Sequence, residues 1–155
     1  MNPYLNLLAL FLLGIILLAG NLMVSVLWKN MADRHGDPRV VAFAQKVITL
    51  SDFGFTLTGT LVVGGASAAV MLLNDLDFST LWVQSASGVF AAHLLLWLLL
   101  QVPLQAKQSR LARVFASGGT VPDEYWKSCR QWNRIRVVQI LLVLSFVGIV
   151  LFKPV

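Results

Sequence analysis

The chain has 155 residues, of which 57% are hydrophobic and 12% are charged, and its formal net charge is +5. A soluble domain carries about 25% charged residues, so this composition excludes an ordinary soluble protein. A nucleic-acid-binding protein would need a soluble basic surface. We therefore attribute the positive charge to anchoring against anionic lipid headgroups and expect no nucleic-acid partner.

The apolar residues fall into four long blocks, at about residues 4–28, 47–73, 80–104 and 137–152. Each block is close to the roughly 20 residues that a helix needs to cross a bilayer. The blocks are continuous, whereas the strands of a membrane barrel alternate and need only about 9–11 residues. The sequence therefore predicts an all-α fold, a polytopic membrane four-helix bundle that forms one integral membrane domain over residues 1–155.

Two of the connections are expected to have helical structure of their own. In the first, the sequence His-Gly-Asp-Pro at residues 35–38 predicts a turn, and Pro38 would begin a helix that runs on into the second block. The third connection should break at residues 117–119 and resume as a helix that continues into the fourth block. That helix has Trp126 and Trp132 among Lys and Arg residues, a mixture typical of the lipid headgroup layer.

The Lys and Arg residues are distributed unevenly between the connections. All of them except Lys153 lie in or beside the first and third connections, whereas the second connection, residues 74–78, has none. Because Lys and Arg near helix ends stay in the cytoplasm, both termini are predicted on the non-cytoplasmic side of the membrane, which would be the periplasmic side in a Gram-negative bacterium.

Polar residues inside the apolar blocks should face the interior of the bundle, since they are costly in lipid. Residues four apart share one face of a helix. In the third block this spacing gives Ser85, Val89, His93, Trp97, Gln101 and Gln105. In the second block it gives Asp52, Thr56, Thr60, Gly64 and Ala68.

These faces predict a polar cavity in the cytoplasmic half of the bundle. Its expected lining residues are Asn21, Ser25, Asp52, Thr56, Gln101 and Gln139, with His93 near the midplane as its floor. Asp52 would lie within reach of Lys46 or of Arg136, and an ion pair with either base is expected to stabilise its charge.

Small residues in the second and third blocks favour a structural interpretation of the same helices. They permit close approach of helices, either within one bundle or across a homodimer. These residues are Gly59, Gly64, Gly65, Ala68, Ser85, Gly88 and Ala92.

Four stretches appear in the order DRHGDPRVVAFAQKVITLSDFGFTLTG, LLQVPLQ, the basic helix with Tyr125 and Trp126, and a final LFKP that contains Lys153 and Pro154. In this arrangement the chain resembles a family of predicted four-helix bacterial inner-membrane proteins with no assigned function. That family is similar in turn to copper-resistance D-type membrane proteins and to protoporphyrinogen oxidases of the HemJ type, in which helix-borne histidines are implicated in haem or metal binding.

The broader resemblance implies haem as the possible cofactor and His93 as its ligand. A haem held between helices commonly has two axial ligands. The related families usually have a histidine in the first span, where this chain has none. Met23, Met71 or a second copy of His93 across a dimer are the candidates for the other ligand. Hydrogen bonding within the bundle and proton transfer stay open as alternative roles of His93.

Motifs of soluble enzymes are absent from the sequence. It has no Gly-rich phosphate loop and no paired histidines at zinc spacing, and its one cysteine, Cys129, predicts neither a disulfide nor a metal site. We assign no catalytic residue and expect no metal. Three functions stay open. The preferred one is a scaffold or accessory subunit, partnered by another membrane subunit or a second copy. The others are a haem- or porphyrin-binding redox protein that uses His93, and a small carrier with a cytoplasm-facing polar cavity.

Overall fold

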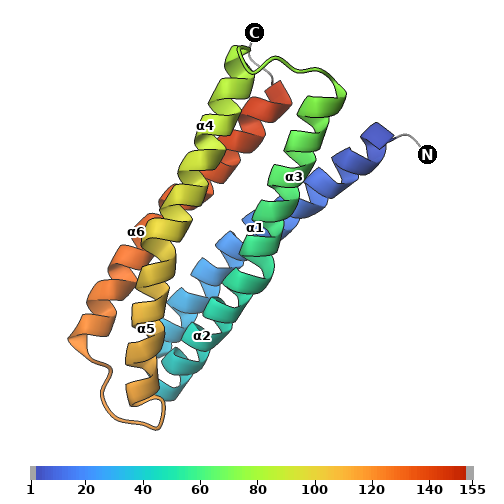
Figure 1. Cartoon of the computed structure of the whole chain (residues 1–155). Coiled ribbons are helices and arrows are strands. Elements are labelled where there is room, and N and C mark those ends of the chain that lie inside the picture. The colour runs from blue at the N-terminus through green and yellow to red at the C-terminus, as the bar shows by residue number, and fades with distance from the viewer. Residues whose placement is uncertain (1–2, 153–155) are drawn as a thin grey trace.

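The computed structural model describes residues 3–152, which are all-α and contain no strand. Two residues named above, Lys153 in the distribution of bases and Pro154 in the final motif, lie outside the described residues. The helices join into four long rods (Figure 1). They are α1 (Pro3–His35); α2 (Pro38–Ser51), η1 (Asp52–Thr56) and α3 (Leu57–Leu73) as the second rod; α4 (Leu81–Leu96), η2 (Trp97–Gln101) and α5 (Val102–Phe115) as the third rod; and α6 (Asp123–Phe152).

Each rod is long and apolar enough to cross a membrane. The rods extend beyond the apolar blocks of the sequence, because the first and third connections are helical on both sides of their breaks and these helical parts are continuous with the spans. Large apolar side chains cover the outer surface, as expected for a bundle whose solvent is lipid. The prediction of an all-α membrane four-helix fold is confirmed.

The rods pack as two main pairs, α1 against α3 and α4 against α6. Figure 1 shows that α1 begins and α6 ends at the same end of the bundle as the connection between α3 and α4. The α1–α2 turn and the α5–α6 connection lie at the opposite end. The Lys- and Arg-rich connections therefore share one end of the molecule.

The turn between α1 and α2 follows the local chemistry of its residues. The helix α1 ends at His35, and Gly36 adopts a φ of +76°, which favours a residue without Cβ. The Asp37 carboxylate accepts a hydrogen bond from the Arg39 backbone N–H at 2.8 Å, and Pro38 begins α2. The predicted turn and helix start are confirmed.

The connection between α5 and α6 breaks the chain where the sequence predicted. The helix α5 ends at Phe115, and Gly118 and Gly119 adopt φ angles of +116° and +119°. The chain resumes at Asp123 as one helix that runs through the fourth apolar block to Phe152.

The connection between α3 and α4 is ordered by Asp77. Its carboxylate accepts hydrogen bonds from the backbone N–H of Ser79 at 2.8 Å and from the Ser79 hydroxyl at 2.5 Å. These donors favour the ionised carboxylate and lower the pKa of Asp77.

Two wide π turns interrupt the second and third rods. In the third rod the π turn Trp97–Gln101 is separated from Pro103 by Val102 alone. Proline has no N–H, and in a regular α-helix the ring of Pro103 would clash with the Leu99 carbonyl. The widened turn accommodates that proline without ending the helix. In the second rod the π turn Asp52–Thr56 carries two fully buried polar residues at its two ends.

The buried core changes character along the bundle axis. Apolar clusters form at both ends, around Phe115 near the α5–α6 connection and around Phe146 at the opposite end. Between them lies a layer of buried polar and charged side chains, which includes Lys29, Asp52 and Arg136.

Close packing of α1 on α3 depends on Gly59. A Cβ atom at this position would lie 2.7 Å from the backbone N of Leu18 and 2.8 Å from the carbonyl O of Gly14. The two backbones therefore touch at Gly59, as predicted for a small residue in a membrane helix pair. A Cβ at Gly65 or Gly88 would meet no atom within 4 Å, so these two residues do not pack the helices of one chain.

Candidate functional site in the bundle interior

Asp52 is the centre of the buried polar layer. It is fully buried, and its Oδ1 accepts a hydrogen bond from Asn21 Nδ2 of α1 at 2.8 Å and from Thr56 Oγ1 at 3.3 Å. Asn21 Nδ2 also donates to Thr56 Oγ1 at 2.8 Å, which closes a triangle of side chains. The Thr60 hydroxyl, one turn further, donates to the Thr56 carbonyl.

The other carboxylate oxygen of Asp52 holds the remaining two rods. Its Oδ2 forms an ion pair with Arg136 Nη2 of α6 and accepts a hydrogen bond from Gln105 Nε2 of α5 at 2.5 Å. The side chains of Asp52 and Arg136 are both fully buried. Of the two bases that the sequence offered, Arg136 is the partner, whereas Lys46 is exposed.

The guanidinium of Arg136 is held on a second side by aromatic and amide groups. It lies over the Trp132 ring at 4.6 Å from the centroid. With its amide oxygen turned toward these donors, Gln101 accepts from Arg136 Nη2 at 3.1 Å and from Trp132 Nε1 at 2.5 Å. A planar guanidinium suits this combination of stacking and hydrogen bonding better than an ammonium group.

We call Asp52, Asn21, Thr56, Gln105 and Arg136 the Asp52 network. Its carboxylate has four side-chain partners, and these come from all four rods. An isolated charge in a medium of low dielectric is very costly, and removing one partner of a buried pair costs about 3–5 kcal/mol. The network can therefore fix the rotation and axial position of each rod relative to the others.

The other predicted cavity residues are buried but less connected. Ser25 is 2% exposed, and Gln139 is fully buried, with neither its amide nitrogen nor its oxygen hydrogen-bonded among the described residues. The structure thus brings Asn21, Asp52 and Thr56 into direct contact and places Gln101 on Arg136.

His93 is a buried ionisable residue without a hydrogen bond in the described part of the chain. It is 1% exposed, and neither ring nitrogen has a hydrogen-bond partner within residues 3–152. Its ring lies beside that of Phe90, with centroids 6.5 Å apart. The predicted face of the third rod is confirmed at His93, Trp97 and Gln101, which are all buried.

In the second rod, the step of four predicts the buried face correctly over only part of the rod's length. Asp52, Thr56 and Thr60 are buried, but Ala68 is exposed, so its predicted place on that face is wrong. A helix has 3.6 residues per turn, and a strict step of four drifts off any face. The buried face continues instead through Val63.

A second buried cluster, which we call the Lys29 cluster, contains Lys29, Gln45 and Tyr125. Lys29 is 1% exposed, and its Nζ donates to Gln45 Oε1 at 2.8 Å and to Tyr125 Oη at 3.1 Å. Its ammonium also lies 5.0 Å from the centroid of the Tyr125 ring and 5.5 Å from that of Trp132. Hydrogen bonds and cation–π contacts compensate its lost hydration.

Sequence reasoning missed this cluster and misplaced Trp132. Lys29 was counted as a base at the membrane surface and Trp132 as a headgroup residue, but both are buried. The signal was present in α6, where the buried residues other than Ser128 follow alternating steps of four and three, the pattern of a helix seam. They are Tyr125, Cys129, Trp132, Arg136, Gln139, Val143 and Phe146.

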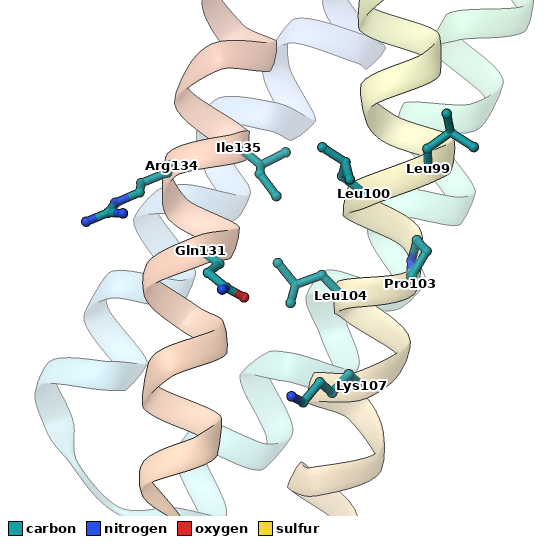
Figure 2. Close-up of a pocket in the computed structure, with 8 residues that line it drawn as sticks. All are labelled: Leu99, Leu100, Pro103, Leu104, Lys107, Gln131, Arg134 and Ile135. Carbon is teal, nitrogen blue, oxygen red and sulfur yellow. The ribbon is translucent and has the colours of Figure 1, made fainter.

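Two hollows on the surface are not lined by the Asp52 network. One, of about 560 Å³, lies between η2–α5 and α6 (Figure 2). The other, of about 400 Å³, is lined in part by Asp33, Arg130 and the buried Cys129. Within the described part of the chain, no group of three or more His, Cys, Asp or Glu residues could hold a metal ion.

The profile of a family described as "Predicted integral membrane protein (DUF2269)" matches residues 5–154. No curated protein and no solved structure matches the chain.

Proposed function

The chain belongs to this DUF2269 family of predicted integral membrane proteins, and from that premise we propose that it is a scaffold or accessory subunit of a bacterial inner membrane. Its partner would be another membrane subunit or a second copy. It would act by presenting a fixed arrangement of membrane helices, without a catalytic residue of its own.

The observation that carries this proposal is the closure of the Asp52 carboxylate. Both of its oxygens are occupied by side chains, and these come from every rod of the bundle. A carrier or a proton relay needs a charged group that exchanges partners, whereas a fully paired buried carboxylate restrains the helices. The pairing of the buried Asp52 carboxylate therefore supports a structural role for the protein.

The proposed orientation puts both termini on the non-cytoplasmic side. It rests on the Lys- and Arg-rich end of the bundle, opposite the start of α1 and the end of α6. Lys29 and Arg136 are buried and do not contribute to that surface, but Arg110, Arg113 and Arg130 remain exposed there.

The scaffold proposal is tested by the mass of the protein extracted from its own membranes. A tagged chain expressed at native level and released in a mild detergent should run in native mass spectrometry as a complex of fixed stoichiometry. The double variant Asp52→Asn/Arg136→Gln should lose the complex, whereas Lys46→Gln, at an exposed base outside the network, should keep it. A single chain carrying only lipid and detergent, in both a mild detergent and a nanodisc, would refute the proposal.

A second candidate function follows from His93. A buried imidazole with both nitrogens unpartnered is what a ligand site for haem would offer. An ultraviolet-visible spectrum of the purified protein, oxidised and dithionite-reduced, would decide it beside His93→Ala. A Soret band that is lost in the variant supports haem binding, and a featureless spectrum after expression with ample haem rejects it.

A further inference from the structure

Trp97 of η2 and Arg136 and Gln139 of α6 contain buried polar atoms that have no hydrogen-bond partner among residues 3–152. These atoms are the indole Nε1 of Trp97, Nε and Nη1 of Arg136, and both the nitrogen and the oxygen of the Gln139 amide. All three residues are at most 2% exposed. Nearly all buried polar groups in folded proteins are hydrogen-bonded to protein or to ordered water, so these atoms require an explanation.

Two side-chain contacts define how the third rod and α6 lie against each other. The two rods run in opposite directions (Figure 1). Toward the Lys- and Arg-rich end, the amide oxygen of Gln101 accepts from Arg136 Nη2 at 3.1 Å. Toward the other end, the rings of Phe90 and Phe146 lie with centroids 5.2 Å apart.

Trp97 and Gln139 lie between these two contacts, at the same height. Each is seven residues from the aromatic contact along its own helix, a distance of about 10 Å at the rise of an α-helix. Each is also about one turn from the contact between the amide and the guanidinium. Since both residues are on the buried side of their helices, their free polar atoms belong to the same part of the interface as those of Arg136.

The free atoms at this place are mostly hydrogen-bond donors. Arg136 and Trp97 can only donate, and the Gln139 amide has two N–H donors and one acceptor oxygen. A ligand must therefore accept hydrogen bonds. Arg136 is already paired with Asp52, so a bound anion would add a net charge to this part of the membrane interior. A neutral acceptor avoids that cost.

We propose that Trp97, Arg136 and Gln139 form a binding site for about two water molecules in the interior of the bundle. A buried water makes about three hydrogen bonds and can both accept and donate, so it serves the Gln139 oxygen as well as the N–H groups around it. The bound water links the third rod to α6 about one turn beyond the Asp52 network, on the side away from the Lys- and Arg-rich end. This inference does not depend on the scaffold role.

The test is nuclear magnetic resonance of the full chain in perdeuterated detergent, with isotope-labelled tryptophan. We expect the indole N–H of Trp97, identified by its loss in Trp97→Phe, to give a cross-peak to long-lived bound water. The indole N–H of Trp132 is equally buried but is hydrogen-bonded by Gln101, and it should give none. Gln139→Leu should abolish the Trp97 cross-peak. Gln131→Leu, the same change at an exposed position of α6, should leave it intact.

Radiolytic footprinting of the wild-type protein gives a second measurement that needs no variant. Hydroxyl radicals formed from bound water oxidise the side chains beside it. We expect Trp97 to be oxidised several-fold faster than Trp132, although both are buried tryptophans.

Three results would overturn the proposal. A missing water cross-peak at Trp97, together with equal oxidation of Trp97 and Trp132, would mean that the interface is dry. A Trp97 indole resonance that shifts when chloride is replaced by gluconate would mean that an anion occupies the site. Equal loss of the cross-peak in Gln139→Leu and Gln131→Leu would mean that the Gln139 amide does not hold the water.

Discussion

Asp52 and His93 are both buried polar residues on inward helix faces, but their surroundings differ. Asp52 has four side-chain partners, whereas His93 has no hydrogen bond within the described chain. In the membrane interior an ionisable residue needs either compensation by the protein or a functional role that justifies its cost. Compensation is visible at Asp52, and at His93 it is not.

Substitution of His93 separates a structural role from a ligand role. His93→Leu removes no hydrogen bond seen within the chain, and an unpartnered buried polar group costs about 1–3 kcal/mol. We expect the free energy of unfolding to be unchanged or to rise by about 1 kcal/mol, measured by thermal unfolding in detergent. The control Gln45→Leu removes a partner of Lys29 and should destabilise the protein. A clear loss of stability in His93→Leu would show that a ligand or another chain satisfies the imidazole.

Helix faces were predictable, but the contacts between helices only in part. The step of four correctly grouped Asp52 with Thr56, and His93 with Gln101, because it follows from helix geometry alone. Which base would meet Asp52 depended on the relative height of two helices far apart in sequence. Lys46 and Arg136 were therefore equal candidates until the structure was known.

The Lys29 cluster was missed because two rules pointed in different directions. A base near the end of a span is usually a topology signal, but Lys29 also falls on the face of α1 that buries Leu22 and Ser25. The alternating spacing of α6 from Tyr125 to Arg136 indicates that this face of α6 is buried along its length. A base of α1 that packs against Tyr125, as Lys29 does, is then buried with it.

The packing of α1 on α3 gives a prediction with an internal control. Gly59→Ala places a methyl group 2.7 Å from the Leu18 backbone, so we expect a loss of about 1–3 kcal/mol in thermal unfolding, because backbones cannot yield as side chains do. Gly65→Ala lies in the same helix with nothing within 4 Å and should be neutral or slightly stabilising. Equal effects of the two substitutions would contradict the close approach at Gly59.

The orientation of the whole bundle is testable by labelling of single cysteines. In a Cys129→Ala background, Asp75→Cys in the α3–α4 connection should react with a membrane-impermeant maleimide added to intact cells with a permeable outer membrane. Ser117→Cys in the α5–α6 connection should react only after the inner membrane is opened. The reverse pattern would place the Lys- and Arg-rich end outside and overturn the proposed topology.

The molecule as a whole combines apolar ends with a charged middle layer, and its four rods meet at one carboxylate. A buried polar network of this kind destabilises the fold if one of its partners is missing, and it restrains the positions of the helices if all partners are present. It supports the view that the interior determines one bundle geometry.

The most direct test of this account is a double-mutant cycle on Asp52 and Arg136, with thermal unfolding in detergent as the measurement. Asp52→Asn and Arg136→Gln should each cost about 3–5 kcal/mol, because each leaves the other charge buried and unpaired. The double variant should cost clearly less than the sum of the two. Additive losses, or single variants as stable as wild type, would contradict the claim that this ion pair restrains the bundle.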